Sequence, residues 1–324
     1  MAVFRRAKRP KGTRLFFATD IHGSEDCFRK FLNARRFYGV DALVLGGDIV
    51  GKSLVPITRS QGGYAAQWNG QAHAKLDERG LAELRQDIRR AGDYPYIGEA
   101  DAIAALRDPR QLDRVFREVV YRSVEDWVAL ADERLRGTGV KCFVAPGNDD
   151  FLEIDAALQD SESVLFAEAR ILALDDEHEM LTTGYSNPTP WKTERELAEP
   201  ELRSLLDVMA DQVRDMSNAV AVVHPPPIAS GLDLAPKIDA NFKVETSGGA
   251  QVLEPVGSRA VRDFLEDQQP LLALHGHVHE GKGTCQIGRT LCLNPGSEYV
   301  DGVLTGALIE IGDGQVISHQ FVLG

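Results

Sequence analysis

The segment Leu-Leu-Ala-Leu-His-Gly-His-Val-His-Glu, residues 271–280, carries the clearest structural signal in the chain. Its apolar start predicts a short buried strand, and Gly276 predicts a turn that places His277 and His279 just beyond the strand end. Imidazole nitrogens are ligands that divalent first-row metals accept readily. The segment therefore predicts a strand that leads into a metal-binding loop.

Four other apolar runs also end in residues that could bind a metal. The runs cover residues 14–19, 42–45, 142–145 and 219–223. The polar residues that follow them are Asp20 and His22, Asp48, Asn148, and His224. In open α/β sheets, ligands bind at the carboxyl ends of the strands, so five such ends can converge on one site.

In this order, five short motifs resemble those of the calcineurin-like metallophosphoesterases: Asp20-x-His22, Gly47-Asp48, Gly147-Asn148, His224 and Gly276-His277-x-His279. The resemblance extends over residues 14–297, apart from a long insertion after Asp48. The later Asn294-Pro295-Gly296-Ser297 turn resembles small bacterial and archaeal phosphodiesterases of this superfamily. The resemblance implies an α/β fold in which two sheets form an αββα sandwich. We expect one domain over residues 1–324, with residues 51–139 as a mostly helical cap or insertion.

The resemblance also implies a centre of two divalent metal ions bridged by Asp48. Asp20, His22 and His279 would complete one metal site, and Asn148, His224 and His277 would complete the other. Manganese is the expected ion, while iron, zinc, cobalt and nickel suit the same mixed nitrogen and oxygen ligands. A hydroxide bridging the two ions would attack a phosphate ester in line.

Asp149 departs from the family pattern, because many members have a histidine after the Gly-Asn pair. A carboxylate beside two dications should have a depressed pKa and be a poor general acid. We therefore expect a leaving group that needs little protonation, or a proton supplied by water or another side chain. This favours diesters over monoesters. Asp149 could also orient a ligand, and Asp150 could cap the following helix.

Two further residues lie near the motifs without matching a family ligand. His275 is expected to support a neighbouring ligand or the fold. Asn294 could orient a ligand or the substrate.

The acidic composition limits the class of partner. The 324-residue chain has a formal net charge of −13, which argues against an electrostatic grip on long nucleic acid. A small phosphate ester or nucleotide remains compatible, because bound dications dominate the local field. A protein phosphatase, another phosphomonoesterase or a nuclease of the same superfamily are alternatives. A scaffold without catalysis is a further alternative, disfavoured because all seven ligand positions are present.

Several compositional features favour a soluble cytoplasmic protein. The four cysteines are scattered and fit small core residues of a reducing compartment, and no apolar run reaches membrane-spanning length. Basic residues crowd the start of the chain and predict a solvated tail. They are Arg5, Arg6, Lys8, Arg9, Lys11 and Arg14.

Capping residues and periodicity place the helices and the remaining strands. Ser24, Asp108 and Ser258 predict helix N-caps, and the first helix should extend to about residue 37. A hairpin is expected over residues 54–59 and 64–68, and helices over residues 71–90 and from 109 to about 135. Strands are expected over residues 164–174 and 179–183, and a helix from Pro200 to about residue 216. The Pro- and Gly-rich residues 225–255 fit a substrate-facing loop.

Overall fold

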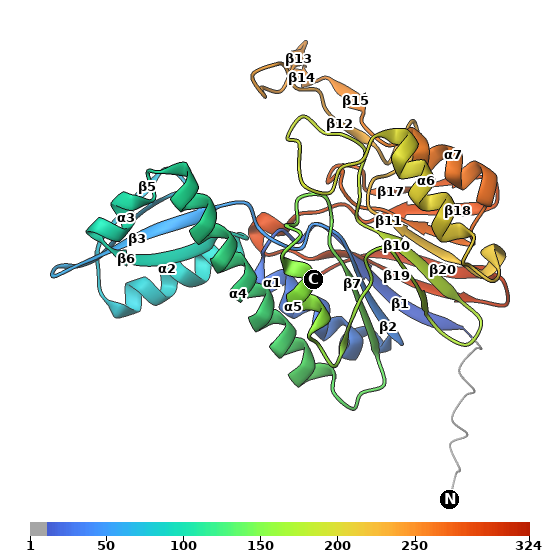
Figure 1. Cartoon of the computed structure of the whole chain (residues 1–324), viewed down its shortest axis with the longest axis horizontal. Helices are drawn as coiled ribbons and strands as arrows, with labels where there is room; N and C mark the ends of the chain where they lie inside the picture. The colour runs from blue at the N-terminus through green and yellow to red at the C-terminus, as the bar shows by residue number, and fades with distance from the viewer. Residues whose placement is uncertain (1–11) are drawn as a thin grey trace, which may run out of the picture.

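Two six-stranded β-sheets form the centre of the computed structural model, which describes residues 12–324 (Figure 1). The first sheet contains β1 (Thr13–Ala18), β2 (Ala42–Gly46), β7 (Lys141–Ala145), β8 (Val164–Phe166), β19 (Thr305–Gly312) and β20 (Gln315–Leu323). Its strand order is β20-β19-β1-β2-β7-β8. Strands β1, β2, β7 and β8 are parallel, so their carboxyl ends lie along one edge.

The second sheet also has six strands, four of which are parallel. It contains β9 (Arg170–Ala173), β10 (Glu179–Thr183), β11 (Val220–Val223), β16 (Leu272–Leu274), β17 (Gly283–Ile287) and β18 (Thr290–Asn294). Its order is β17-β18-β16-β11-β10-β9, and β10, β11, β16 and β18 are parallel. The central strands β11 and β16 are apolar throughout because both of their faces are covered.

Apolar side chains fill the space between the sheets. Phe17 and Phe143 from the first sheet share one buried cluster with Val222 and Leu272 from the second. Helices cover the two outer faces: α1 (Glu25–Ala34), α4 (Pro109–Leu135) and α5 (Ile154–Gln159) on the first sheet, and α6 (Glu199–Ala210) and α7 (Arg259–Gln268) on the second. The predicted αββα sandwich is confirmed.

The three predicted N-caps are also confirmed. The side chain of Ser24 accepts a hydrogen bond from the Cys27 N–H, and Ser258 accepts one from the Val261 N–H. Asp108 accepts one from the N–H of Arg110 at the start of α4. The first helix was expected to extend to about residue 37: α1 itself stops at Ala34, and helical backbone continues as a π-helical turn, η1 (Arg35–Gly39).

The segment of residues 51–139 contains a small sheet as well as helices. Its strands are β3 (Leu54–Ser60), β4 (Gly63–Trp68), β5 (Gln71–Leu76) and β6 (Tyr94–Glu99), in the order β5-β4-β3-β6, and its shorter helices are α2 (Glu78–Arg90) and α3 (Ala100–Ala105). The predicted β3–β4 hairpin is confirmed. The helix prediction for residues 71–76 was wrong: they form an edge strand, and α2 begins after the Asp77 cap.

The long helix α4 joins this segment to the sandwich. Its Trp127 stacks on Phe28 of α1 with ring centroids 4.4 Å apart, and Val124 and Ala131 belong to the same core cluster. Helix α4 therefore packs on the first sheet. In Figure 1 the small sheet extends away from the sandwich on the far side of α4.

Predictions for the second half of the chain need two corrections, and the long loop contains strands that were not predicted. Residues 164–174 form two strands, β8 and β9, which belong to different sheets. Helix α6 ends at Ala210, and a 3-10 turn, η2 (Met216–Asn218), follows later. The loop of residues 225–255 contains two short hairpins, built from β12 (Leu234–Pro236) with β15 (Leu253–Pro255) and from β13 (Thr246–Ser247) with β14 (Ala250–Gln251).

The remaining sequence expectations concern cysteines, membranes and the basic tail. The cysteines are free, and Cys27, Cys142 and Cys292 are buried. None of the helices within residues 12–324 is long and apolar enough to cross a membrane. The predicted basic tail lies outside the described residues except for Arg14.

The loop after β2 crosses the turn after α2 at very short range. A Cβ atom on Gly92 would lie 2.0 Å from the His22 carbonyl oxygen, and one on Gly51 would lie 1.8 Å from the Gly92 carbonyl oxygen. Gly92 also has a φ of +89°, which L side chains rarely adopt. Gly92→Ala would force these backbones apart, so we expect its free energy of unfolding in urea to fall by about 1–3 kcal/mol.

Gly62→Ala is the matched control for this measurement. The Cβ atom of that variant would find its nearest neighbour, the Ser60 hydroxyl, at 3.9 Å. A change within about 0.5 kcal/mol is expected for such a site. Equal stability of the two variants would show that the crossing tolerates a side chain.

Candidate metal centre

The structure brings all seven predicted ligand residues to one end of the sandwich. Each follows the carboxyl end of a parallel strand, and the strands come from both sheets. β1 leads to Asp20 and His22, β2 to Asp48, β7 to Asn148, β11 to His224, and β16 to His277 and His279. The convergence expected from the sequence is therefore present, while the role of these residues as ligands stays a prediction.

The side chains divide into two groups whose ligand atoms lie within 4.8 Å of one another. One group contains Asp20, His22 and His279. In it the Nε2 atoms of the two histidines are 2.9 Å apart, and His279 Nε2 is 3.5 Å from Asp20 Oδ1.

The other group contains Asp48, His224 and His277. His224 Nε2 lies 3.3 Å from Asp48 Oδ1, and the amide oxygen of Asn148 lies 2.7 Å from His277 Nδ1. Asn148 therefore adds a neutral oxygen to this group.

Asp48 lies between the two groups. Its Oδ1 faces His224, while its Oδ2 lies 3.8 Å from the Nε2 atom of His22. A third set of close ligand atoms joins His22, Asp48 and Asp149. One carboxylate thus offers an oxygen to each side, as a ligand shared between two ions would.

The donor set fits divalent metal ions. His224 Nδ1 lies 3.0 Å from the Gly46 carbonyl oxygen, which leaves the buried Nε2 without a hydrogen-bond partner and aimed at Asp48. Metal-binding histidines usually donate their other ring N–H to a carbonyl or carboxylate in this manner. Two carboxylates and several imidazoles are a mixture that first-row divalent ions accept.

The ionisable groups of the site also favour a bound cation. Burial lowers the pKa of His224, but the negative charge of Asp48 outweighs burial and raises it to about 10. Burial likewise raises the pKa of Asp20, but the hydrogen bond to His279 and the charge of His224 lower it to about 2. The carboxylates of Asp20 and Asp48 therefore favour the protonated, positively charged form of His224. A bound metal ion would replace that proton.

Backbone strain also gathers here. Asp20, His22, Asp48 and His277 have φ values of 52°, 39°, 49° and 65°, in the left-handed region that non-glycine residues rarely adopt. Such strain persists where the surrounding structure enforces it, most often at functional sites.

Buried polar side chains hold the ligand loops in place. Asp150 accepts hydrogen bonds from the N–H groups of Ile49, Val50 and Gly147, and so ties the loop after β2 to the loop after β7. The prediction that Asp150 caps the next helix was wrong, because these contacts occupy its carboxylate. Burial, reinforced by the charge of Asp48, raises the pKa of Asp150 to about 7.

Asn294 and His275 act on the backbone. The Asn294 amide donates to the carbonyl oxygens of Gly276 and Val278, and so orients the histidine loop. The ring nitrogen Nδ1 of His275 lies 2.8 Å from the Val223 carbonyl oxygen. Both residues therefore support the loops that carry the predicted ligands, one of the roles expected for each.

Sequence reasoning missed Lys52. Its Nζ lies 2.5 Å from Asp149 Oδ2, at the edge of the site. In the protein alone, burial and the charge of Asp48 raise the pKa of Asp149 to about 6, against the opposing effect of Lys52. The lowered pKa expected from the sequence assumed two bound dications and stays a prediction. The signal for Lys52 was its position as the first cation after Asp48.

Tyr299 was also missed. It belongs to η3 (Tyr299–Asp301), and its ring centroid lies 4.8 Å from that of His22 and 6.0 Å from that of His279. It packs against the outer side of the first ligand group.

Comparison with known proteins agrees with this architecture. No family model matches the chain. The crystal structure of TT1561 from Thermus thermophilus is similar with a TM-score of 0.53 at 12% identity, over 97% of this chain and 98% of that one. The chain therefore shares the fold of TT1561.

Two other similarities are weaker. An uncharacterized protein of Methanocaldococcus jannaschii, MJ1162, is 29% identical over 114 residues. That match spans 35% of this chain and 45% of the relative, which is less than half of its length. YfcE, a phosphoesterase from E. coli, has 13% identity and a TM-score of 0.33 over 95% of this chain and 98% of its own, a score too low to support an argument.

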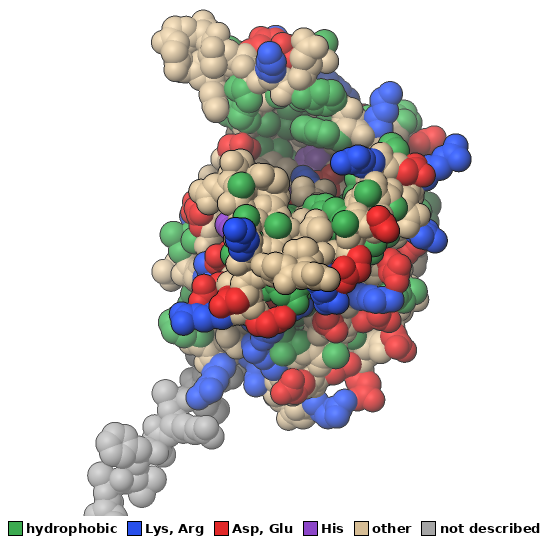
Figure 2. Space-filling view, turned by 90° about the vertical axis from the view of Figure 1, so that its left-hand side faces the viewer, with side chains coloured by type: hydrophobic (Ala, Val, Ile, Leu, Met, Phe, Trp, Pro, Cys, Tyr) green, Lys and Arg blue, Asp and Glu red, His purple; other side chains and the backbone are tan. Residues whose placement is uncertain are grey.

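A cavity of about 750 Å³ opens beside the two groups of predicted ligands. Figure 2 shows it as a hollow with histidine inside and hydrophobic side chains above. Asp48, Asn148, His277 and His279 line one side, and Lys52 is the single residue of the 51–139 segment that lines it in the described structure. Most of the opposite wall comes from residues 187–191 and 235–257.

Proposed function

We propose that this protein is a metal-dependent phosphohydrolase whose preferred substrates are phosphodiesters. The observation that carries the proposal is the position of Asp48, which directs one oxygen toward each of two ligand groups. The fold supports the proposal by placing five ligand loops at one edge, and the adjoining cavity has room for an organic phosphate.

The side chains have separable roles in this proposal. Asp20, His22 and His279 would hold one ion, and Asn148, His224 and His277 would hold the other, with Asp48 shared. Manganese is our first choice of ion. When bound, two such ions would neutralise phosphate charge and lower the pKa of a water molecule. Asn148 binds without adding negative charge, so the pair retains attraction for a phosphate.

The preference for diesters rests on Lys52 and Asp149. The ion pair between them occupies the place where the family pattern would put a histidine. A diester carries one negative charge on its phosphate, whereas a monoester carries up to two. Lys52 is the one Lys or Arg among the lining residues of the described chain, so the smaller charge suits this site better.

Metal removal tests the proposal directly. We expect the purified protein to contain about two divalent ions per chain. Treatment with a chelator should lower hydrolysis of bis(p-nitrophenyl) phosphate by at least about 100-fold, and Mn²⁺ should restore it. Metal content is measured by mass spectrometry alongside the rates. Full activity of metal-free protein would contradict a metal-dependent mechanism.

The same assay separates the alternatives. Faster hydrolysis of p-nitrophenyl phosphate than of the diester would identify a phosphomonoesterase. Cleavage of single-stranded DNA that weakens steeply with salt would identify a nuclease. Metal-loaded protein that hydrolyses none of these substrates would favour a scaffold that retains the fold.

A further inference from the structure

The wall of the cavity that faces the ligand groups is apolar. It is formed by the loop around Trp191 and by the arm, which we define as residues 234–255 with the hairpins β12–β15 and β13–β14. Its main side chains are Pro190, Trp191, Pro236, Ile238, Val244 and Pro255.

This apolar surface is exposed to solvent. The Trp191 side chain is 64% exposed and Phe242, on the arm, is 57% exposed, with their ring centroids 6.4 Å apart. Val244 of the arm, which lines the cavity, is also exposed. A group of exposed apolar side chains around a cavity is typical of a ligand-binding surface.

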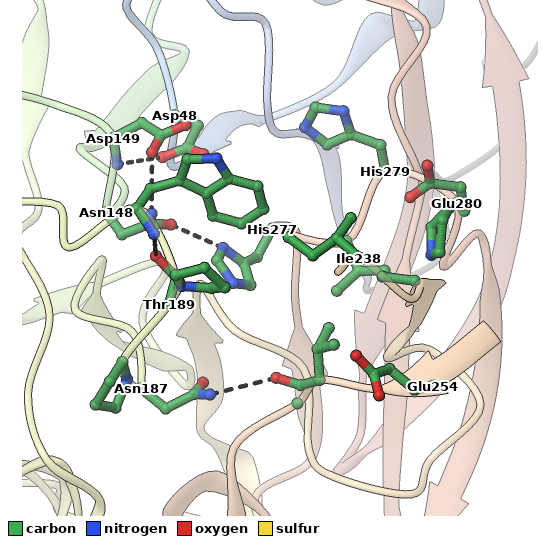
Figure 3. Close-up of a pocket in the computed structure, with 18 of the residues that line it drawn as sticks. Asp48, Asn148, Asp149, Asn187, Thr189, Ile238, Glu254, His277, His279 and Glu280 are labelled. Carbon is green, nitrogen blue, oxygen red and sulfur yellow. Dashed lines mark hydrogen bonds between the residues drawn. The ribbon is translucent and has the colours of Figure 1, made fainter. Parts of the chain in front are cut away.

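The charges around the cavity limit the number of phosphates. Beyond the ligand groups, the cavity has one cation, Lys52, which is already paired with Asp149. Glu254 and Glu280 line the remaining part of the cavity. In Figure 3, Glu254 lies across the cavity from Asp48 and Asp149. A chain of phosphates would meet these carboxylates without cations to bind it.

The backbone of the wall also offers phosphate fewer N–H donors than a wall without proline would. Pro188, Pro190, Pro236 and Pro255 line it, and proline has no N–H to donate. Backbone N–H groups are the usual uncharged ligands of phosphate. The wall therefore favours an apolar substituent of the substrate. Phosphate should bind only at the two groups of proposed ligands.

We propose that the site selects a diester with one phosphate and one bulky apolar substituent, which lies against Trp191 and Ile238. This inference rests on the proposed function, because it names the substrate class of the same site. Either an aromatic ring or an alkyl chain supplies the required chemistry. Polyphosphates and long oligonucleotides are excluded as preferred substrates.

A series of diesters with one common leaving group tests the selection. The probes are methyl, phenyl and hexadecyl p-nitrophenyl phosphate, assayed with Mn²⁺. We expect kcat/KM for the phenyl or the hexadecyl ester to exceed that for the methyl ester by at least about tenfold. The better of the two identifies the apolar group as aromatic or aliphatic. Equal values for all three esters would overturn the inference while leaving the proposed function intact.

Variants of the wall locate the preference. Trp191→Ala and Ile238→Ala should each reduce the ratio of the preferred ester to the methyl ester by about fivefold or more. Leu253→Ala is the matched control, because Leu253 is 52% exposed on β15 but does not line the cavity. An unchanged ratio in both wall variants would overturn the inference.

Binding provides a readout that needs no turnover. Calorimetric titration of Mn²⁺-loaded protein should show tighter binding of diphenyl phosphate than of dimethyl phosphate, again by about tenfold or more. If no ester is hydrolysed but this difference is present, the proposed function fails and the binding preference stands. Equal affinities would refute the preference itself.

Discussion

Asp48→Asn should lower metal-dependent diester hydrolysis by more than about 100-fold. Loss of a side chain that only supports a metal ligand typically costs about 10- to 100-fold in affinity or activity. Asp48 faces both ligand groups, so its replacement removes charge from two ion sites together. The amide has nearly the shape of the carboxylate, and the variant should fold. Its metal content and its rate are measured on the same preparation.

The control for this variant is Asp176→Asn. Asp176 is exposed in the turn between β9 and β10, far along the chain from every ligand loop. Its replacement removes the same charge and should leave turnover within about twofold of the parent, as expected for a surface site. A folded Asp48→Asn protein with two bound ions and normal turnover would remove the basis of the proposed function.

The positions of the seven predicted ligand residues could be inferred because each depends on local sequence. An apolar run such as residues 219–223 forms a strand, and the next polar residue, His224, must then lie at its carboxyl end. Parallel pairing brings these ends together. A short motif therefore contains most of the information needed to place its side chain.

The Pro- and Gly-rich composition of residues 225–255 predicted a loop that faces the substrate, but the side chains that form the cavity wall could not be predicted in this way. Trp191 and Ile238 lie in loops whose direction depends on contacts with distant segments, such as the bond from the Asn187 amide to the Val256 carbonyl oxygen. Lys52 meets Asp149 across almost a hundred residues of sequence. The periodicity of apolar residues along the chain contains no information about such long-range contacts.

Two errors in the fold have equally specific causes. Strand β5 lies at the edge of its sheet and is mostly exposed, so it lacks the apolar alternation that identifies a strand. Residues 164–174 resemble one strand because apolar residues occur in the strands of both sheets. The chain in fact leaves the first sheet after Phe166 and enters the second at Arg170. Ala169, with a φ of 49°, marks the crossing.

Lys52→Met should lower kcat/KM for a diester by about 10- to 100-fold without changing the metal content. Removal of one group that stabilises charge in a transition state typically costs about 100- to 1000-fold in rate. The Lys52 side chain is 54% exposed, so solvent screening should reduce its contribution. Lys52→Arg should retain more of the activity. Lys192→Met is the control, since Lys192 is exposed near the cavity but does not line it.

A double variant decides how Lys52 acts. If the Lys52 charge only neutralises Asp149, then Lys52→Met combined with Asp149→Asn should regain most of the lost activity. In that double variant residue 149 has no negative charge that requires a cation. If Lys52 attracts the phosphate itself, the double variant should remain as slow as Lys52→Met. We expect the second result, because Lys52 is the one cation that the described chain places in the cavity wall beside Asp48 and Asn148. Recovery in the double variant would limit Lys52 to holding Asp149.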